Sequence, residues 1–172
     1  MIVDTIASIL TGALLLRFWT QVVRVRPPAS LAQFIFHVTD WLVKPLRRVT
    51  PSSGGYDWAS LIGAYLVIVL STVAGLVVVG LAWEPILLLS VLRFVQWIFY
   101  GFMATLIVEA IFSWVNPHAP LAPYVGALNE PLLRPLRRVI PLFGNVDLSP
   151  LAALILLQIG LKLISALLIS FP

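Results

Sequence analysis

Cysteine is absent from this 172-residue chain, and charged residues make up only 10% of it. Without cysteine the chain can form neither a disulfide bond nor a thiolate metal site. The shortage of charge is more restrictive, because a soluble domain usually carries about 25% charged residues. A water-soluble protein of this size could not cover its surface with so few charged groups. We therefore infer that hydrocarbon surrounds most of the chain.

Residue patterns that indicate an enzyme are also missing. The two histidines, His37 and His118, lie in different connecting segments, and no nucleophile elbow, metal-ligand spacing or intramembrane carboxylate pair occurs. Glycine-containing turns follow both basic segments of the chain, but they lack the lysine of a phosphate-binding loop. We expect a non-enzymatic protein without a metal, a cofactor or a nucleic-acid partner.

The chain contains four long apolar stretches, at about residues 2–23, 59–82, 86–115 and 150–171. Each reaches the ~20 residues that a helix needs to cross the hydrocarbon core. Backbone polar groups in lipid must be satisfied within the segment, which favours helices, and the runs are too long for barrel strands. The first stretch lacks the basic start and the cleavage site of a secretory signal, so we expect it to be retained. The sequence predicts an all-α membrane protein with four transmembrane helices.

An internal repeat divides these stretches into two pairs. Residues 44–51 (Lys-Pro-Leu-Arg-Arg-Val-Thr-Pro) align without a gap with residues 134–141 (Arg-Pro-Leu-Arg-Arg-Val-Ile-Pro). Each copy holds two spans, so both copies must enter the membrane in the same direction. We expect two tandem parallel repeats, at residues 1–85 and 86–172, each built as helix, amphipathic interfacial segment and helix. Inverted repeats, which build many transporters, need an odd number of spans in each copy.

Lysine and arginine gather in the two long connections, one inside each repeat. The first connection carries Arg24, Arg26, Lys44, Arg47 and Arg48, and the second carries Arg134, Arg137 and Arg138. Basic residues stay on the cytoplasmic side of a membrane. We therefore expect a multi-pass protein of the bacterial inner membrane, with both connections in the cytoplasm and both termini in the periplasm.

Both connections show the spacing of amphipathic helices. In the first, apolar side chains from Leu31 to Val49, Phe34 and Trp41 among them, recur on one face. The prolines at positions 45 and 135 should break or kink these helices. A basic amphipathic segment beside a span should lie in the headgroup layer, where arginine pairs with lipid phosphates. The candidate residues for binding anionic lipids or a protein partner are Lys44, Arg47, Arg48, Arg134, Arg137 and Arg138. The alternative is that these residues only fix the topology.

Charged residues inside the spans are costly there and therefore informative. Arg17 and Glu109 lie at nearly the same depth in the first and third spans when the repeats are aligned. An ion pair between them, joining the two copies, is one hypothesis, and snorkelling of each side chain toward the cytoplasm is the other.

Polar residues of the third and fourth spans suggest a further hypothesis. Arg93 and Gln96 with Gln158 and Lys162 could together line a polar cavity, although a snorkelling lysine and hydrogen bonds between helices are favoured. The aspartates at positions 57 and 147 are interpreted as helix caps.

The twice-occurring Pro-Leu-Arg-Arg-Val-x-Pro motif is followed in each copy by glycine and aspartate, and the second copy ends in Asp-Leu-Ser-Pro at residues 147–150. This pattern strongly resembles the YggT family of small bacterial membrane proteins, over nearly the whole chain and in two copies. The first copy departs from it with Tyr-Asp-Trp-Ala at residues 56–59. The resemblance implies a link to osmotic-stress tolerance and ion balance. Family relatives in photosynthetic lineages are linked to membrane-complex assembly and to division or nucleoid organisation.

The functional expectation combines these points. We expect a membrane protein that supports osmotic-stress tolerance or ion homeostasis through contacts with anionic lipids or a membrane-protein partner. One alternative is a small ion or solute channel or transporter, and another is a scaffold for membrane-complex assembly or cell division. Four short spans enclose little volume, so a pore would require a homo-oligomer.

Overall fold

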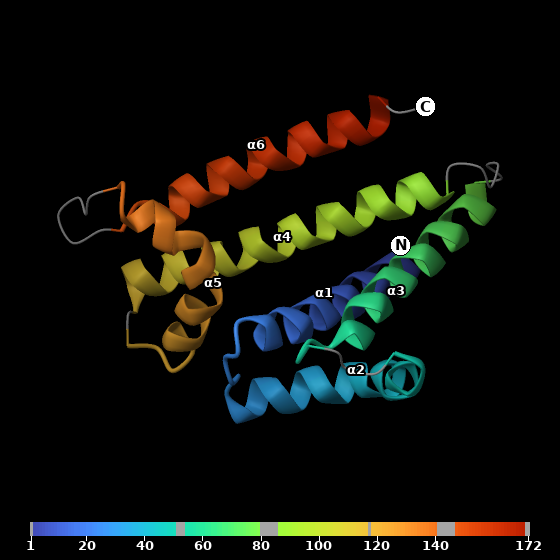
Figure 1. Ribbon diagram of the computed structural model, residues 1–172, viewed down its shortest axis with the longest axis horizontal. Helices are drawn as coiled ribbons and strands as arrows, with labels where there is room; N and C mark the ends of the chain where they lie inside the picture. Colours follow the sequence, from blue (N-terminus) through green and yellow to red (C-terminus); the bar gives the residue numbers. More distant parts are fainter. Residues whose placement is uncertain (1, 51–53, 80–85, 117, 141–146, 171–172) are drawn as a thin grey trace. The chain divides into compact units, whose positions relative to one another are not determined.

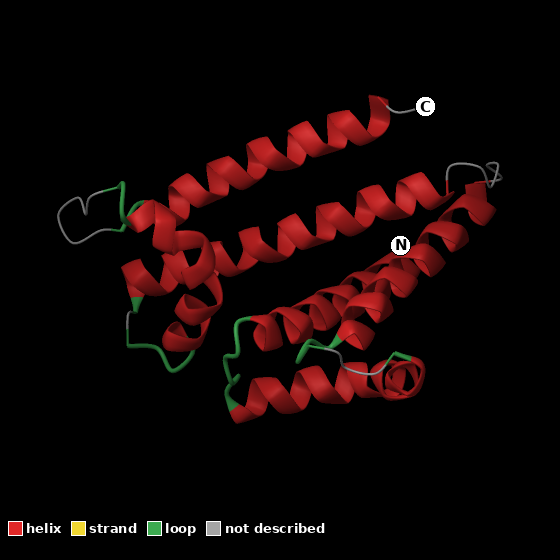
Figure 2. Ribbon diagram, in the orientation of Figure 1, coloured by secondary structure: helices red, strands yellow, loops and turns green. Residues whose placement is uncertain are grey.

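The computed structural model describes residues 2–50, 54–79, 86–116, 118–140 and 147–170, and every regular element in these ranges is an α-helix (Figures 1 and 2). The helices are α1 (Ile2–Val22), α2 (Ala29–Val49), α3 (Trp58–Val79), α4 (Ile86–Val115), α5 (Ala122–Arg137) and α6 (Ser149–Ser170). The all-α fold expected from the sequence is confirmed.

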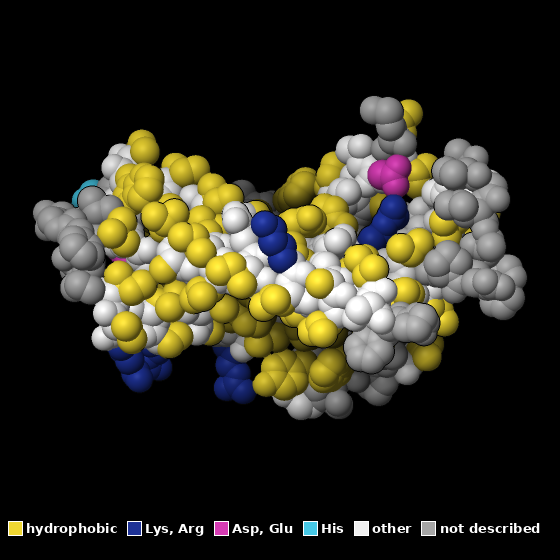
Figure 3. Space-filling view, turned by 90° about the horizontal axis from the view of Figure 1, so that it is seen from above, with side chains coloured by type: hydrophobic (Ala, Val, Ile, Leu, Met, Phe, Trp, Pro, Cys, Tyr) yellow, Lys and Arg dark blue, Asp and Glu magenta, His cyan; other side chains and the backbone are white. Residues whose placement is uncertain are grey.

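Four of these helices, α1, α3, α4 and α6, are long and apolar enough to cross a membrane. They coincide with the four apolar stretches of the sequence, and α4, with 30 residues, is the longest. Large apolar side chains such as Leu70, Leu87 and Leu163 are exposed on them. Figure 3 shows a surface on which hydrophobic side chains predominate and charged ones are few. Such a surface suits contact with lipid, as the composition indicates.

The chain forms two compact units. The first contains residues 1–22 and 29–98, and the second contains residues 23–28 and 99–172. The first part of α4 therefore belongs to the first unit, where Phe94 packs edge-on against Tyr65 of α3 with ring centroids 5.4 Å apart. The sequence repeats, by contrast, meet at the start of α4. The division at residues 85 and 86 stays a prediction about the repeats.

In the first unit α1 and α3 pack along one another, and α2 packs against both. Leu14 and Val43 are fully buried in the core that these three helices share. Gly63 of α3 allows the close approach of α2, because a Cβ atom there would lie 3.3 Å from Leu46 and 3.4 Å from Leu42. Pro45 does not interrupt α2, but Figure 1 shows the end of the helix turned away from the direction of the rest. The helix is therefore kinked rather than broken.

In the second unit α5 packs against α6, and side chains from three helices share a small core. Leu106 of α4, Leu133 of α5 and Ala153 of α6 form its centre. Pro131 and Pro135 both lie inside α5, which nevertheless continues to Arg137. Each unit thus places an amphipathic helix against its spans, which fixes where the basic side chains of that helix lie.

Replacing Gly63 with leucine should lower the thermal unfolding midpoint of the detergent-solubilised protein, because the new side chain must push α2 away from α3. Overpacking of this kind typically costs about 1–3 kcal/mol. Gly75→Leu, on the same helix and with no atom within 4 Å of its Cβ position, is the matched control. Circular dichroism during heating measures both variants, and an equal shift in the two would contradict the role given to Gly63.

Candidate functional site

Each amphipathic helix is tied to the start of the following span by an arginine–aspartate pair ten residues apart. In the first unit Arg47 donates from Nε to Asp57 Oδ1 at 3.1 Å and from Nη2 to Asp57 Oδ2 at 2.6 Å. In the second unit Arg137 donates from Nε to Asp147 Oδ2 at 2.8 Å. We call these two pairs the clamps. Both belong to the repeated motif, and in both it is the first arginine of the Arg-Arg pair that is bound.

A buried arginine of α1 joins the first clamp. Arg17 donates from Nη1 to Asp40 Oδ1 at 2.7 Å and to Thr39 Oγ1 at 2.6 Å, and its Nε lies 3.5 Å from Asp57 Oδ2. Its guanidinium also lies over the ring of Phe36, 4.8 Å from the centroid. One charge that would be costly inside a span therefore has partners on α2 and at the start of α3. The first charge cluster comprises Arg17, Asp40, Lys44, Arg47 and Asp57.

A buried glutamate of α4 occupies the corresponding place in the second unit. Glu109 accepts a hydrogen bond from Arg137 Nη2 at 2.8 Å and another from Asn129 Nδ2 at 2.7 Å. Thr105 in turn donates to the amide oxygen of Asn129 at 2.7 Å. Arg137 also pairs with Glu130 at 3.0 Å. The second charge cluster comprises Glu109, Glu130, Arg137 and Asp147.

The two clusters are built on equivalent positions of the repeat but differ in charge. The repeat aligns Asp40 with Glu130 and each clamp with the other, so these parts are equivalent. The preceding span contributes a cation, Arg17, to the first cluster and a carboxylate, Glu109, to the second. The first cluster therefore holds three cations and two carboxylates, and the second holds one cation and three carboxylates. Electrostatically, the two repeats are not interchangeable.

The clamp aspartates are held in their ionised form. Burial raises the pKa of Asp57, but hydrogen bonds from Arg47 and Ser60 outweigh it and keep that pKa below its ordinary value. Burial likewise raises the pKa of Asp147, and the backbone N–H of Ser149 and the side chain of Arg137 together bring it below the ordinary value. The Ser149 N–H bond, at 2.9 Å to Oδ1, agrees with the helix-cap interpretation of Asp147. Asp57 instead accepts a hydrogen bond from Ser60 Oγ at 2.7 Å.

The six basic candidates of the sequence separate into two groups. Arg47 and Arg137 are bound in the clamps, and Lys44 pairs with Asp40 at 3.0 Å while remaining largely exposed. The other three have exposed side chains that form no hydrogen bond or ion pair with any residue that the structure describes: Arg48, Arg134 and Arg138. The sequence alone could not show which arginine of each Arg-Arg pair is bound. Neighbouring residues of a helix point about 100° apart, so the rotation of the helix decides which of the two faces the aspartate.

Several residues of the clusters were not singled out from the sequence as site residues. Thr39 and Asp40 bind Arg17 in the first cluster, and Asn129 and Glu130 bind Glu109 and Arg137 in the second. Their positions match at the repeat offset, a signal that could have indicated them. The hypothesis of an Arg17–Glu109 ion pair stays a prediction, and each of the two side chains has partners within its own unit. The polar cavity suggested from Arg93, Gln96, Gln158 and Lys162 also stays a prediction.

Comparison with known proteins identifies the family. A sequence profile described as CCB3/YggT matches residues 1–78 and again residues 88–168. This chain belongs to the CCB3/YggT family. The double match confirms both the family and the tandem repeat expected from the sequence, and each matched copy contains one clamp.

Relatives within the CCB3/YggT family cover most of the chain. The uncharacterized protein YggT of Escherichia coli (strain K12) is 33% identical over 165 residues, which are 92% of this chain and 84% of the relative. An uncharacterized protein of Pseudomonas aeruginosa is 37% identical over 181 residues, covering 98% of this chain and 87% of the relative. An uncharacterized protein of Haemophilus influenzae is 30% identical over 156 residues, with 90% and 84% covered. No solved structure matches the chain significantly.

Replacing the first arginine of each pair should destabilise the protein, and replacing the second should not. Arg47→Gln and Arg137→Gln each remove hydrogen bonds to a carboxylate and should cost about 1–2 kcal/mol, reduced by partial exposure of the arginines. Arg48→Gln and Arg138→Gln, the adjacent controls, should change stability by less than about 0.5 kcal/mol. Unfolding midpoints in detergent measure the four variants, and equal losses within a pair would rule out the clamps as the stabilising feature.

Acid should weaken the clamps. The folded-state pKa values of Asp40, Asp57 and Asp147 lie below their unfolded value of 3.8, so the stability they contribute is fully present above about pH 4 to 5. It is lost as the pH falls through the folded-state pKa values, because the unfolded chain then binds more protons.

The unfolding midpoint should therefore fall steeply below about pH 4, and Asp147→Asn should flatten the fall by removing one of these groups. Unfolding measured between pH 7 and pH 3 tests this expectation. A parallel pH profile in the wild type and the variant would show that Asp147 makes no such contribution.

Proposed function

We propose that this protein is a non-enzymatic multi-pass protein of the bacterial inner membrane that supports osmotic-stress tolerance or ion homeostasis by binding anionic lipid headgroups through α2 and α5. The observation that carries the proposal is the separation of the basic residues. Three exposed arginines, Arg48, Arg134 and Arg138, have no partner among the described residues, whereas the clamps fix the helices that carry them.

The clamps favour this role because they position the unpaired arginines. Arg48 follows Arg47 and Arg138 follows Arg137, so a bound side chain lies directly before these two unpaired arginines, and Arg134 lies three residues before Arg137 on the same helix. A guanidinium group pairs with phosphate through two parallel hydrogen bonds. A helix fixed in direction loses less conformational freedom when such a pair forms, which favours binding.

The exposed aromatic residues of α2 support the same location. Phe34 and Trp41 belong to the apolar face expected from the sequence, yet 56% and 65% of their surfaces are exposed. The buried positions of α2 are instead Ile35, Thr39 and Val43, which face α1 and α3. Aromatic side chains are favoured at the boundary between headgroups and hydrocarbon. The apolar face of α2 therefore has one part against the protein and another available to lipid.

The proposed orientation places α2 and α5 in the cytoplasm and both termini in the periplasm. It rests on the concentration of lysine and arginine in the two connections. Anionic lipids give the cytoplasmic leaflet a negative surface potential, which attracts basic segments beside a span. The unpaired arginines would then meet the headgroups that they bind best.

A lipid preference that depends on the unpaired arginines tests the proposal. Native mass spectrometry of the detergent-solubilised protein should show more bound phosphatidylglycerol than phosphatidylcholine. The combined substitution Arg48→Gln, Arg134→Gln and Arg138→Gln should reduce this preference by roughly tenfold or more, since each basic residue contributes about 1 kcal/mol near anionic lipid. The same variant should fail to restore growth after osmotic shock in a strain without the gene.

The control for this test is Lys162→Gln, which removes an exposed cation from α6 rather than from an amphipathic helix. It should leave the lipid preference unchanged. A preference for phosphatidylglycerol that survives the triple substitution would contradict the proposed lipid contact. A variant that loses the preference but still restores growth would separate lipid binding from the physiological role.

A further inference from the structure

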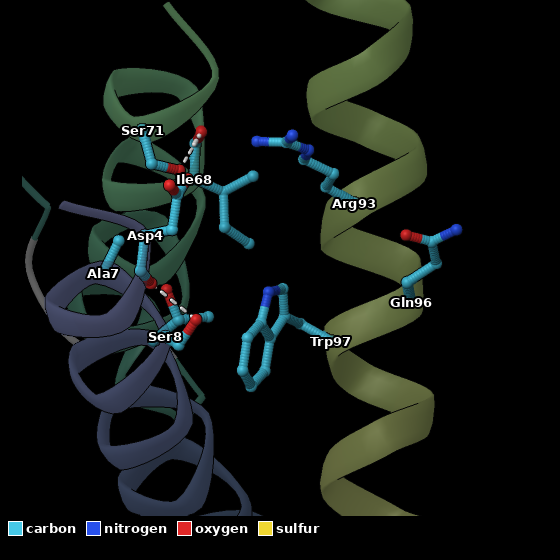
Figure 4. A pocket seen from close by; sticks show the side chains of 9 residues that line it. Asp4, Ala7, Ser8, Ile68, Ser71, Arg93, Gln96 and Trp97 are labelled. Atoms are coloured by element: carbon cyan, nitrogen blue, oxygen red, sulfur yellow. Dashed lines mark hydrogen bonds between the residues drawn. The ribbon is translucent and has the colours of Figure 1, made fainter. Parts of the chain in front are cut away.

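A polar pocket lies in the first unit, between α1, α3 and the first part of α4 (Figure 4). Its volume is about 340 Å³, within the range of sites for small molecules. Asp4 and Arg17 are thirteen residues apart on α1, so Asp4 lies about 20 Å along the helix from the first charge cluster. The pocket is therefore separate from the clamp and does not depend on the function proposed for α2 and α5.

The lining of this pocket is polar although the helices that form it are apolar. Its polar side chains include Asp4, Ser8 and Thr11 of α1, Ser71 of α3, and Arg93 and Trp97 of α4. Figure 4 shows Arg93 and Trp97 reaching from α4 toward the other two helices, whereas Gln96 points away from them. Polar residues inside spans usually face a bundle interior or a water-filled cavity and mark a functional site.

One hydroxyl group of the lining is buried without a partner. Ser8 donates to the backbone oxygen of Asp4 at 2.6 Å, and Ser71 donates to that of Ile68 at 2.9 Å, as hydroxyl groups on helices commonly do. Thr11 is only 1% exposed, yet its hydroxyl forms no hydrogen bond with any residue that the structure describes. A buried hydroxyl without a partner is unfavourable, so a ligand that supplies a partner is favoured.

The charged groups of the pocket favour a ligand without charge. The carboxylate of Asp4 already has partners, and the guanidinium of Arg93 attracts it electrostatically. An added anion would be repelled by Asp4, and an added cation would be repelled by Arg93. Both repulsions are stronger in a site of low dielectric constant than in water. An uncharged ligand meets neither repulsion and leaves the existing partners of Asp4 in place.

Several hydrogen bonds are available to such a ligand. The oxygens of Ser8 and Ser71 keep lone pairs that can accept a further bond, and the hydroxyl of Thr11 can donate or accept. Arg93 donates one long hydrogen bond, at 3.4 Å to Thr72 Oγ1, and a guanidinium group has five N–H donors. Each hydroxyl of a ligand can likewise donate or accept. A compound with several hydroxyl groups therefore suits this mixed lining.

We propose that this pocket binds a small uncharged sugar, whose hydroxyl groups pair with Thr11, Ser71 and Arg93. Trp97 supplies an aromatic wall and Ile68 an apolar contact for the C–H groups of the sugar ring (Figure 4). Sites for small molecules commonly combine aromatic or apolar walls with a few placed polar groups. The same chemistry occurs in a free sugar and in the headgroup of a glycolipid.

Three sugars with the same ring test the proposal on the full-length protein. They are glucose, which is uncharged, glucuronate, which is an anion, and glucosamine, which is a cation at pH 6. The protein is kept in octaethylene glycol monododecyl ether, a detergent without a sugar headgroup that would compete. Isothermal titration should show saturable binding of glucose or of hexyl glucoside. The two charged sugars should bind at least about tenfold more weakly, because each meets a like charge in the pocket.

Thr11→Val removes the unpartnered hydroxyl and keeps the shape of the side chain. It should weaken sugar binding about fivefold, the effect of one lost hydrogen bond. The unfolding midpoint of the unliganded protein should not fall, because no hydrogen bond of that hydroxyl is lost within the described residues. Ser71→Ala should weaken the binding by a similar factor and gives a second measurement if Thr11→Val does not fold. Thr20→Val, the same change on α1 outside the lining, is the control and should bind as the wild type does.

The pattern of binding decides between the two sources and can overturn the proposal. Binding of glucose identifies a free sugar, and binding of hexyl glucoside alone identifies the headgroup of a glycolipid. Affinity for glucuronate or glucosamine equal to that for glucose would overturn the proposal of an uncharged ligand. Sugar binding that neither Thr11→Val nor Ser71→Ala weakens would show that the pocket is not the site. Absence of saturable binding by both glucose and hexyl glucoside would also overturn the proposal.

Discussion

An ion pair between the end of an interfacial helix and the start of a spanning helix organises both halves of this protein. A chain that leaves the headgroup layer must enter hydrocarbon as a helix, because lipid offers no hydrogen bonds to its backbone. Asp57 and Asp147 stand at these two entry points, and Arg47 and Arg137 bind them from the ends of α2 and α5. The direction of each amphipathic helix relative to its own span is set by this contact.

The buried charges of the preceding spans, α1 and α4, find their partners in the same clamps and the amphipathic helices beside them. Arg17 reaches Asp40 and Asp57 in the first unit, and Glu109 reaches Arg137 in the second, so each has a partner of opposite sign. The duplication has thus kept the geometry of the clamp while reversing the sign of the group that the span supplies. Two copies that share the clamp geometry but differ in charge are suited to different ligands or partners. Two identical copies would not be.

The first unit separates two kinds of polar chemistry along its spans. At one end α2 presents arginine beside the clamp, where a phosphate could pair with Arg48. About 20 Å along α1 the pocket holds Asp4 and Arg93 on opposite walls. Helices of this composition would otherwise present apolar surface throughout. Polar groups at both ends are therefore the features most worth testing for function.

The sequence by itself determined the four spans, the tandem repeat and the amphipathic character of α2 and α5, because hydrophobic length and helical periodicity are local properties. It did not determine which arginine of each pair is bound, since that depends on helix rotation and on an aspartate beyond a turn. It placed Phe34 and Trp41 on one apolar face with the other apolar residues of α2, although only the packing of α1 and α3 decides which part of that face is covered. The pocket too belongs to tertiary structure, because its walls come from three helices that no sequence pattern brings together.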